Sequence, residues 1–84
     1  MNSKHRRTLE AIFAPPVTRN MEWGDIERLL IAMGCTVVEG SGSKVRFCHG
    51  NLVASFHRPH PEKEAKLYQV KDAREFLRKM GVEP

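Results

Sequence analysis

The chain has 84 residues and a formal net charge of +4, from fourteen lysines and arginines against ten aspartates and glutamates. This length allows one domain with one hydrophobic core and excludes a second core or a deep enclosed pocket. The positive charge favours a polyanionic partner, although a charge of this size does not identify one by itself.

Cysteine content and hydropathy argue against extracellular and membrane classes. Cys35 and Cys48 are the only cysteines, too few for a disulfide framework, and no C-x-x-C pair indicates a Cys/His metal site. The N-terminus is polar and basic, without an apolar run long enough for a signal peptide or a membrane span. We therefore expect a cytoplasmic protein with no metal, no cofactor and no membrane partner.

Two helices are predicted in the first half of the chain. The first covers residues 3–14, with Ser3 as its expected N-cap, and ends before Pro15. The second covers residues 22–33, and Gly34 follows it where a left-handed C-terminal residue is favoured. The apolar residues of this second helix have the spacing of a core-facing stripe: Ile26, Leu29, Leu30 and Met33.

A β-hairpin is predicted over residues 44–57, because Gly50-Asn51 separates two strand-like runs. A two-residue turn places Lys44 opposite His57, and alternation then gives the hairpin one apolar face and one basic face. The apolar face consists of Val45, Phe47, Ala54 and Phe56. The basic face consists of Lys44, Arg46, Ser55 and His57.

The remaining segments complete an α+β pattern. A short β-branched strand is predicted over residues 35–38, a charged loop over residues 62–66 and a last helix over residues 70–80. Sequential short strands favour an antiparallel sheet covered by helices on one face, which is a two-layer sandwich.

Four short motifs occur in the chain: W-G-D-I-E-R-L-L from Trp23, Gly42-Ser43, Arg58-Pro59-His60-Pro61 and Met80-Gly81. In their order and spacing they resemble the HicA family of toxins. The similarity extends over residues 22–82, which makes residues 1–21 an N-terminal helical extension and linker and residues 22–84 the HicA-like domain. The resemblance implies a double-stranded RNA-binding-domain-like fold of α-β-β-β-α order, with an extra N-terminal helix.

The resemblance also implies a function. HicA proteins are metal-independent ribonucleases that cleave mRNA, and a cognate HicB antitoxin restrains each of them. On this basis we expect the toxin of a type II toxin–antitoxin system. Its substrate is expected to be mRNA, and its partner a HicB-type antitoxin in a hetero-oligomeric complex.

One position departs from the family pattern. HicA sequences commonly carry their catalytic histidine at the start of the second strand, after Gly-Ser, and this chain has Lys44 there. A lysine ordinarily stays charged at neutral pH, so it binds phosphate well but transfers protons poorly. The family's catalytic residue therefore does not carry over to this chain by position.

Two other histidines are the candidate catalytic residues. His57 is predicted to lie opposite Lys44, so it would supply a proton-transfer group beside a phosphate-binding cation. The alternative is an exposed residue at a strand end without a catalytic role. His60 lies between two prolines that restrict the backbone, and it acts either as a general acid or phosphate ligand or as part of a rigid turn. The candidate RNA-binding residues are Ser43, Lys44, Arg46, Ser55 and Arg58.

Three functions are therefore open at this point. The first is a ribonuclease toxin, and the second is a non-catalytic RNA-binding module of the same fold, which the replacement of the family histidine by Lys44 favours. The third is a protein-binding component whose basic face meets an acidic partner.

Overall fold

The helices and strands follow the predicted order. The computed structural model describes all 84 residues. Its strands form one antiparallel sheet in the order β1-β2-β3, so the α+β class and the α-β-β-β-α order are confirmed. The elements are α1 (Ser3–Phe13), α2 (Trp23–Ala32), β1 (Thr36–Glu39), β2 (Lys44–His49), β3 (Leu52–His57) and α3 (Leu67–Lys79). None of the helices has the length and hydropathy needed to cross a lipid bilayer.

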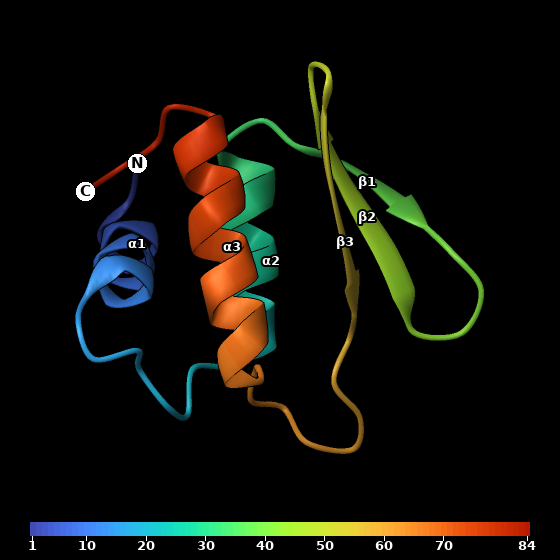
Figure 1. The fold of residues 1–84 in the computed structure, drawn as a ribbon, viewed down its shortest axis with the longest axis horizontal. Helices are drawn as coiled ribbons and strands as arrows, with labels where there is room; N and C mark the ends of the chain where they lie inside the picture. The colour runs from blue at the N-terminus through green and yellow to red at the C-terminus, as the bar shows by residue number, and fades with distance from the viewer.

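The elements are stacked in layers (Figure 1). The sheet lies on one side of α2 and α3, and α1 lies on their other side. α2, α3 and the sheet thus form the predicted two-layer sandwich, and α1 covers the side of the helices that faces away from the sheet. This arrangement leaves the other face of the sheet without a helix.

An aromatic cluster joins α2 to the sheet. The ring of Trp23, at the start of α2, lies with its centroid 5.0 Å from that of Phe56 and 6.2 Å from that of Phe47. The two phenylalanine rings meet edge-on at 5.9 Å. Tilted and edge-to-face pairs of this kind each contribute about 0.5–1.5 kcal/mol beyond the area that they bury. Trp23 is therefore an anchor of the core, and its ring is not free to stack on a ligand.

The N-terminal helix α1 shares this hydrophobic core. Leu9 and Ile12 are buried in the same cluster as the residues of α2 and α3. The side chain of Arg74 donates from Nε to the carbonyl oxygen of Ile12 over 2.8 Å, which satisfies a carbonyl at the end of α1. The guanidinium of Arg78 lies 5.5 Å from the ring centroid of Phe13. Packing and polar contacts from α3 thus hold both the side and the end of α1.

The N-cap of α1 and the start of α3 differ from the prediction. The side chain of Asn2 accepts the backbone N–H of His5 over 2.7 Å, so Asn2 caps α1 and Ser3 is already helical. α3 begins at Leu67, where the pattern predicted residue 70, because the side-chain oxygen of Gln69 accepts the backbone N–H of Lys66 over 2.9 Å. In both cases a neighbouring polar side chain satisfies a backbone donor that the apolar pattern does not report.

The charged loop after β3 is tied to the start of α2. The backbone N–H of Trp23 donates to the carbonyl of Lys63 over 2.8 Å, and that of Ala65 donates to Met21 over 2.7 Å. These bonds form a short antiparallel bridge outside the main sheet. They hold residues 63–65 beside the start of α2.

Candidate functional site

The hairpin has the register that its two-residue turn predicts. Lys44 is paired with His57 and Arg46 with Ser55. All four side chains are exposed on the side of the sheet that no helix covers, which we call the outer sheet face. The opposite face carries Val45, Phe47 and Phe56, all of which are buried. The predicted division into a core face and a basic face is therefore confirmed.

A hollow of about 520 Å³ opens on the outer sheet face between β2 and β3. Two cationic side chains, Lys44 and Arg46, line it together with His57, and no carboxylate does. A concave surface that carries positive charge without a neighbouring acid concentrates anions such as phosphate. The remaining lining residues are Gly40, Val45, Ser55 and Phe56.

Ser43 contacts His57 at the rim of this hollow. Its hydroxyl oxygen lies 3.4 Å from Nδ1 of His57, a long contact in which the tautomer of the imidazole decides which group donates. The carbonyl of Ser43 also accepts the backbone N–H of Arg58 over 2.9 Å. The turn before β2 is thus hydrogen-bonded to the residue that follows His57. This bond fixes the position of Ser43 relative to His57.

The backbone of His57 is held from the helical layer as well. Gln69 is 1% exposed, and its side-chain Nε2 donates to the carbonyl of His57 over 2.7 Å. Its Oε1 accepts the backbone N–H of Lys66, so the same amide group is hydrogen-bonded to both His57 and Lys66. The end of β3 is therefore fastened to the first turn of α3.

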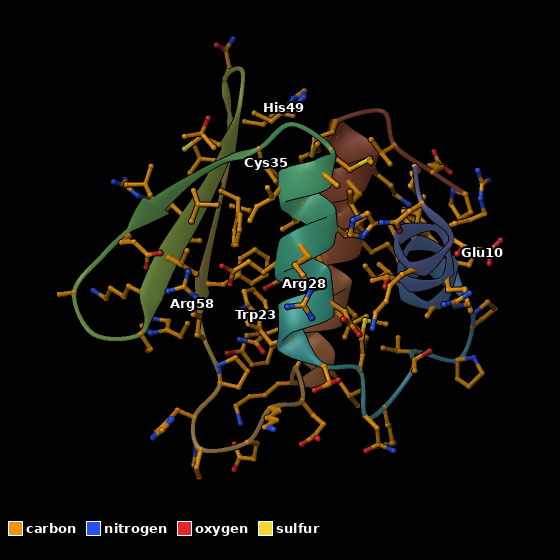
Figure 2. All side chains as sticks on the ribbon, turned by 180° about the vertical axis from the view of Figure 1, so that it is seen from behind. Glu10, Trp23, Arg28, Cys35, His49 and Arg58 are labelled. Atoms are coloured by element: carbon orange, nitrogen blue, oxygen red, sulfur yellow. The ribbon has the colours of Figure 1, made fainter.

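Arg58 lies between two carboxylates. Its Nε and Nη2 donate to Glu27 of α2 over 3.0 and 2.9 Å, and its Nη1 and Nη2 donate to Glu39 of β1 over 2.6 and 2.9 Å. Figure 2 shows Arg58 in the space between the sheet and the first half of α2, close to Trp23. Trp23 adds a bond from its Nε1 to Glu27 over 2.9 Å. Arg58 thus connects the end of β1, the end of β3 and α2.

These contacts perturb the acid–base properties of all three groups. Hydrogen bonds from Arg58 hold the pKa of Glu27 below its ordinary value, against the opposing effect of burial, with a further contribution from Trp23. The same bonds from Arg58 lower the pKa of Glu39. The hydrogen bonds to Glu39 and Glu27 raise the pKa of Arg58. The network is charged throughout the physiological range, and its cation is neutralised within the protein.

His60 does not join His57. It lines a separate hollow of about 380 Å³ at the start of α2, beside Trp23 and Arg58. The lining of that second hollow mixes acids and bases: Glu22, Arg28, Glu62 and Lys63. The structure therefore groups Ser43, Lys44, Arg46, Ser55 and His57 around the outer sheet face and separates Arg58 and His60 from them.

Three residues of this region were not predicted from the sequence: Glu27, Glu39 and Gln69. Glu27 and Glu39 gain their role only because Arg58 lies between them, and no spacing in the sequence indicates that. Gln69 does leave a signal, because it falls in line with Ala73 and Phe76 at the i, i+4, i+7 positions of the apolar stripe of α3. A polar residue in such a stripe indicates a buried group that needs hydrogen-bond partners.

The outer sheet face combines a side chain that can transfer protons with side chains that can bind phosphate. The imidazole of His57 provides a proton-transfer group, and the side chains of Lys44 and Arg46 provide positive charge for a phosphate. No three histidine, cysteine, aspartate or glutamate side chains gather into a possible metal site.

Comparison with known proteins assigns this region to a family. Residues 23–82 match the family model described as the HicA toxin of bacterial toxin–antitoxin systems. Searches of curated proteins and of solved structures returned no match. The matched range begins at the first residue of α2 and contains the whole sheet and α3, whereas α1 precedes it.

Proposed function

Because the chain belongs to the HicA toxin family of bacterial toxin–antitoxin systems, we propose that this toxin is a metal-independent endoribonuclease. Its substrate is mRNA in the cytoplasm, and a HicB-type antitoxin neutralises it. The observation that carries the proposal is the pairing of Lys44 with His57 across the hollow of the outer sheet face. This pairing puts a histidine beside the position at which the family commonly has one.

His57 serves as the general base in this proposal. It takes the proton from a ribose 2′-hydroxyl, whose oxygen forms a bond to the adjacent phosphorus while the bond from phosphorus to the 5′-oxygen breaks. A water molecule protonates the leaving 5′-oxygen, and the resulting hydroxide takes the proton that His57 holds. The products are a 2′,3′-cyclic phosphate and a 5′-hydroxyl end.

Lys44 and Arg46 supply the electrostatic part of the reaction. Both line the hollow beside His57, and no carboxylate there neutralises them. Fixed positive charges of this kind stabilise the negative charge that accumulates on the phosphorane oxygens. In this proposal the Nδ1–H of His57 donates to the hydroxyl oxygen of Ser43, which orients the imidazole and leaves Nε2 unprotonated to take the proton of the 2′-hydroxyl.

Arg58 has a structural role in this proposal. Its guanidinium already makes charged hydrogen bonds to Glu27 and Glu39, so a phosphate would have to displace a carboxylate in order to bind it. We therefore assign to Arg58 the positioning of His57, its neighbour in the chain, and assign phosphate binding to Lys44 and Arg46.

The test compares two histidines that lie in separate hollows. Purified wild type is incubated with end-labelled RNA, and the 3′ ends of the products are analysed. We expect 2′,3′-cyclic phosphate from wild type, a loss of about 10²–10⁴-fold in rate for His57→Ala, and nearly full activity for His60→Ala. Intact RNA after incubation with wild type, or equal rates for wild type and His57→Ala, would contradict the assignment.

A second candidate function is RNA binding without cleavage. The specific observation in its favour is Lys44 itself, which replaces the catalytic histidine of the family pattern with a phosphate-binding group. In that case wild type binds RNA with an affinity that falls steeply with salt, and the RNA is recovered intact.

A further inference from the structure

The strand β3 has one side without a partner. It lies at the edge of the sheet, where only β2 is bonded to it. His49 and Leu52 flank the two-residue turn, so alternate residues from Leu52 onward direct their backbone groups toward β2. The residues between them, Val53 and Ser55, turn both their N–H and their C=O groups away from the sheet.

The free part of this edge ends at His57. By the same alternation the carbonyl of His57 turns away from β2, and it is the group that Gln69 binds over 2.7 Å. The N–H and C=O groups of Val53 and Ser55 have no such partner among the side-chain and loop hydrogen bonds. A row of unpaired backbone groups on an edge strand is a template for another strand.

Edge strands are usually protected against such pairing, and β3 is not. It contains no lysine and no proline, its register with β2 is continuous without a bulge, and Val53 is 55% exposed. The opposite edge of the sheet differs. β1 has only four residues and ends at Glu39, which is bonded to Arg58. The sheet is therefore open to strand addition on the β3 side.

The helical layer leaves room beside this edge. A groove of about 340 Å³ runs between residues 51–56 and α3. On the helix it is bounded by Phe76, with acidic and basic side chains on either side: Asp72, Glu75 and Lys79. An added strand would therefore have space for the side chains that point toward α3, and an apolar ring to pack against.

We propose that this edge binds an extended strand of the antitoxin, and that the strand is apolar on its inner side and acidic on its outer side. The proposal rests on the proposed function for the identity of the partner. Its inner side chains pack over Phe76, and its outer ones lie beside Val53 and Ser55, one strand away from Arg46. Carboxylates at the outer positions complement Arg46 and the net charge of +4. A second copy of this chain would instead bring two basic faces together.

A strand bound at this edge would also hinder RNA from reaching the hollow that holds His57. Ser55 and Phe56 line both the groove at the edge and the hollow that holds His57. A strand seated in the groove lies next to the hollow, and its outer carboxylates occupy the positive field that would otherwise attract phosphate. The same contact would therefore both hold the antitoxin and block the RNA-binding hollow.

The test uses this chain and a HicB-type antitoxin, the partner that the proposed function assigns to it. Hydrogen exchange of the backbone amides is measured for the free toxin and for the complex, and we expect exchange at Val53 and Ser55 to slow at least tenfold on binding. Val53→Pro removes an N–H that β2 does not use, so the hairpin is retained. We expect it to weaken binding by about tenfold, the equivalent of one hydrogen bond. Val53→Thr keeps the N–H and is the matched control, with binding close to wild type.

Cleavage of RNA by the free proteins is measured in parallel. A Val53→Pro variant that cleaves RNA as wild type does but binds the antitoxin about tenfold more weakly supports the docking site. A complex in which these two amides exchange as fast as in the free toxin, or equal affinity for wild type and Val53→Pro, overturns it and leaves the ribonuclease assignment intact. Failure of wild type to bind the antitoxin also overturns it. Slow exchange at these amides in a dimer of the free chain would assign the edge to a second copy and likewise contradict the proposal.

Discussion

Gln69 joins the first turn of α3 to the end of β3, because its side-chain Nε2 donates to the backbone carbonyl of His57 over 2.7 Å. The amide is buried, and its other end accepts the N–H of Lys66. One side chain thus satisfies the carbonyl of His57, which has no partner within the sheet, and the N–H of Lys66, which has no partner within the helix. The position of His57 on the outer sheet face therefore depends on a residue in the helical layer.

Replacing Gln69 by leucine should destabilise the protein. The change leaves the carbonyl of His57 and the N–H of Lys66 without their partner, which we expect to cost about 2 kcal/mol. For a domain of this size the midpoint of thermal unfolding falls by about 10 °C. Circular dichroism during heating measures it, with the exposed Lys71→Gln on the same helix as the control. A midpoint for Gln69→Leu equal to that of the control would show that the two bonds contribute nothing.

Arg58 and Arg46 should respond in opposite ways to replacement by lysine. Arg58→Lys replaces a planar group that bonds to two carboxylates by a point charge, and we expect the unfolding midpoint to fall by about 5 °C. Arg46→Lys, on the exposed outer sheet face, should leave the midpoint unchanged. A midpoint that falls for Arg46→Lys and not for Arg58→Lys would reverse these roles.

Arg46 should also contribute to RNA binding. Arg46→Gln should reduce the slope of log affinity against log salt by about 0.7, as expected for the loss of one phosphate contact to a single strand.

Stability should fall at acid pH in a way that depends on Glu27. Arg58 lowers the pKa of this carboxyl in the folded state below the ordinary value of 4.5. The carboxylate therefore contributes stability above that pH, and the contribution is lost as the pH falls through the lowered pKa. Glu27→Gln should be less stable than wild type near neutral pH, and the difference should shrink progressively below about pH 4.5.

Urea denaturation at a series of pH values measures this difference. Glu10→Gln is the control, because Glu10 is exposed on α1, far from the sheet, as Figure 2 shows. A difference between wild type and Glu27→Gln that stays constant down to pH 3 would contradict the role of the ion pair.

The N-terminal helix should be necessary for stability, although it precedes the family match. Ile12 is fully buried between α1 and the other helices, and Ile12→Ala should cost about 3 kcal/mol through lost burial and the cavity that remains. Arg6→Ala, exposed on the same helix, should change the stability by less than about 0.5 kcal/mol. Chemical denaturation of both variants gives the comparison, and equal stabilities would show that α1 is only loosely attached.

Local rules account for much of the fold. The apolar stripe of the second helix, the left-handed Gly34 after it and the Gly50-Asn51 turn each predict an element that the structure contains. The two-residue turn also predicts the register, because turn length determines which residues of a hairpin face each other. These predictions succeed because each depends on residues within a few positions of one another. The cap of α1 at Asn2 and the start of α3 at Leu67 were missed, since a capping side chain decided both.

The sequence by itself determined the order of the elements, the pairing of Lys44 with His57 and the division of the hairpin into an apolar and a basic face. Only the tertiary structure decided the contacts of Arg58 and His60 and the exposure of the edge of β3. It placed Arg58 between Glu27 and Glu39, put His60 in a different hollow from His57 and left the edge of β3 uncovered beside α3. The physical reason is that alternation and turn geometry act between near neighbours in the chain. Ion pairs, buried amides and open edges depend instead on where α2, α3 and the sheet come together.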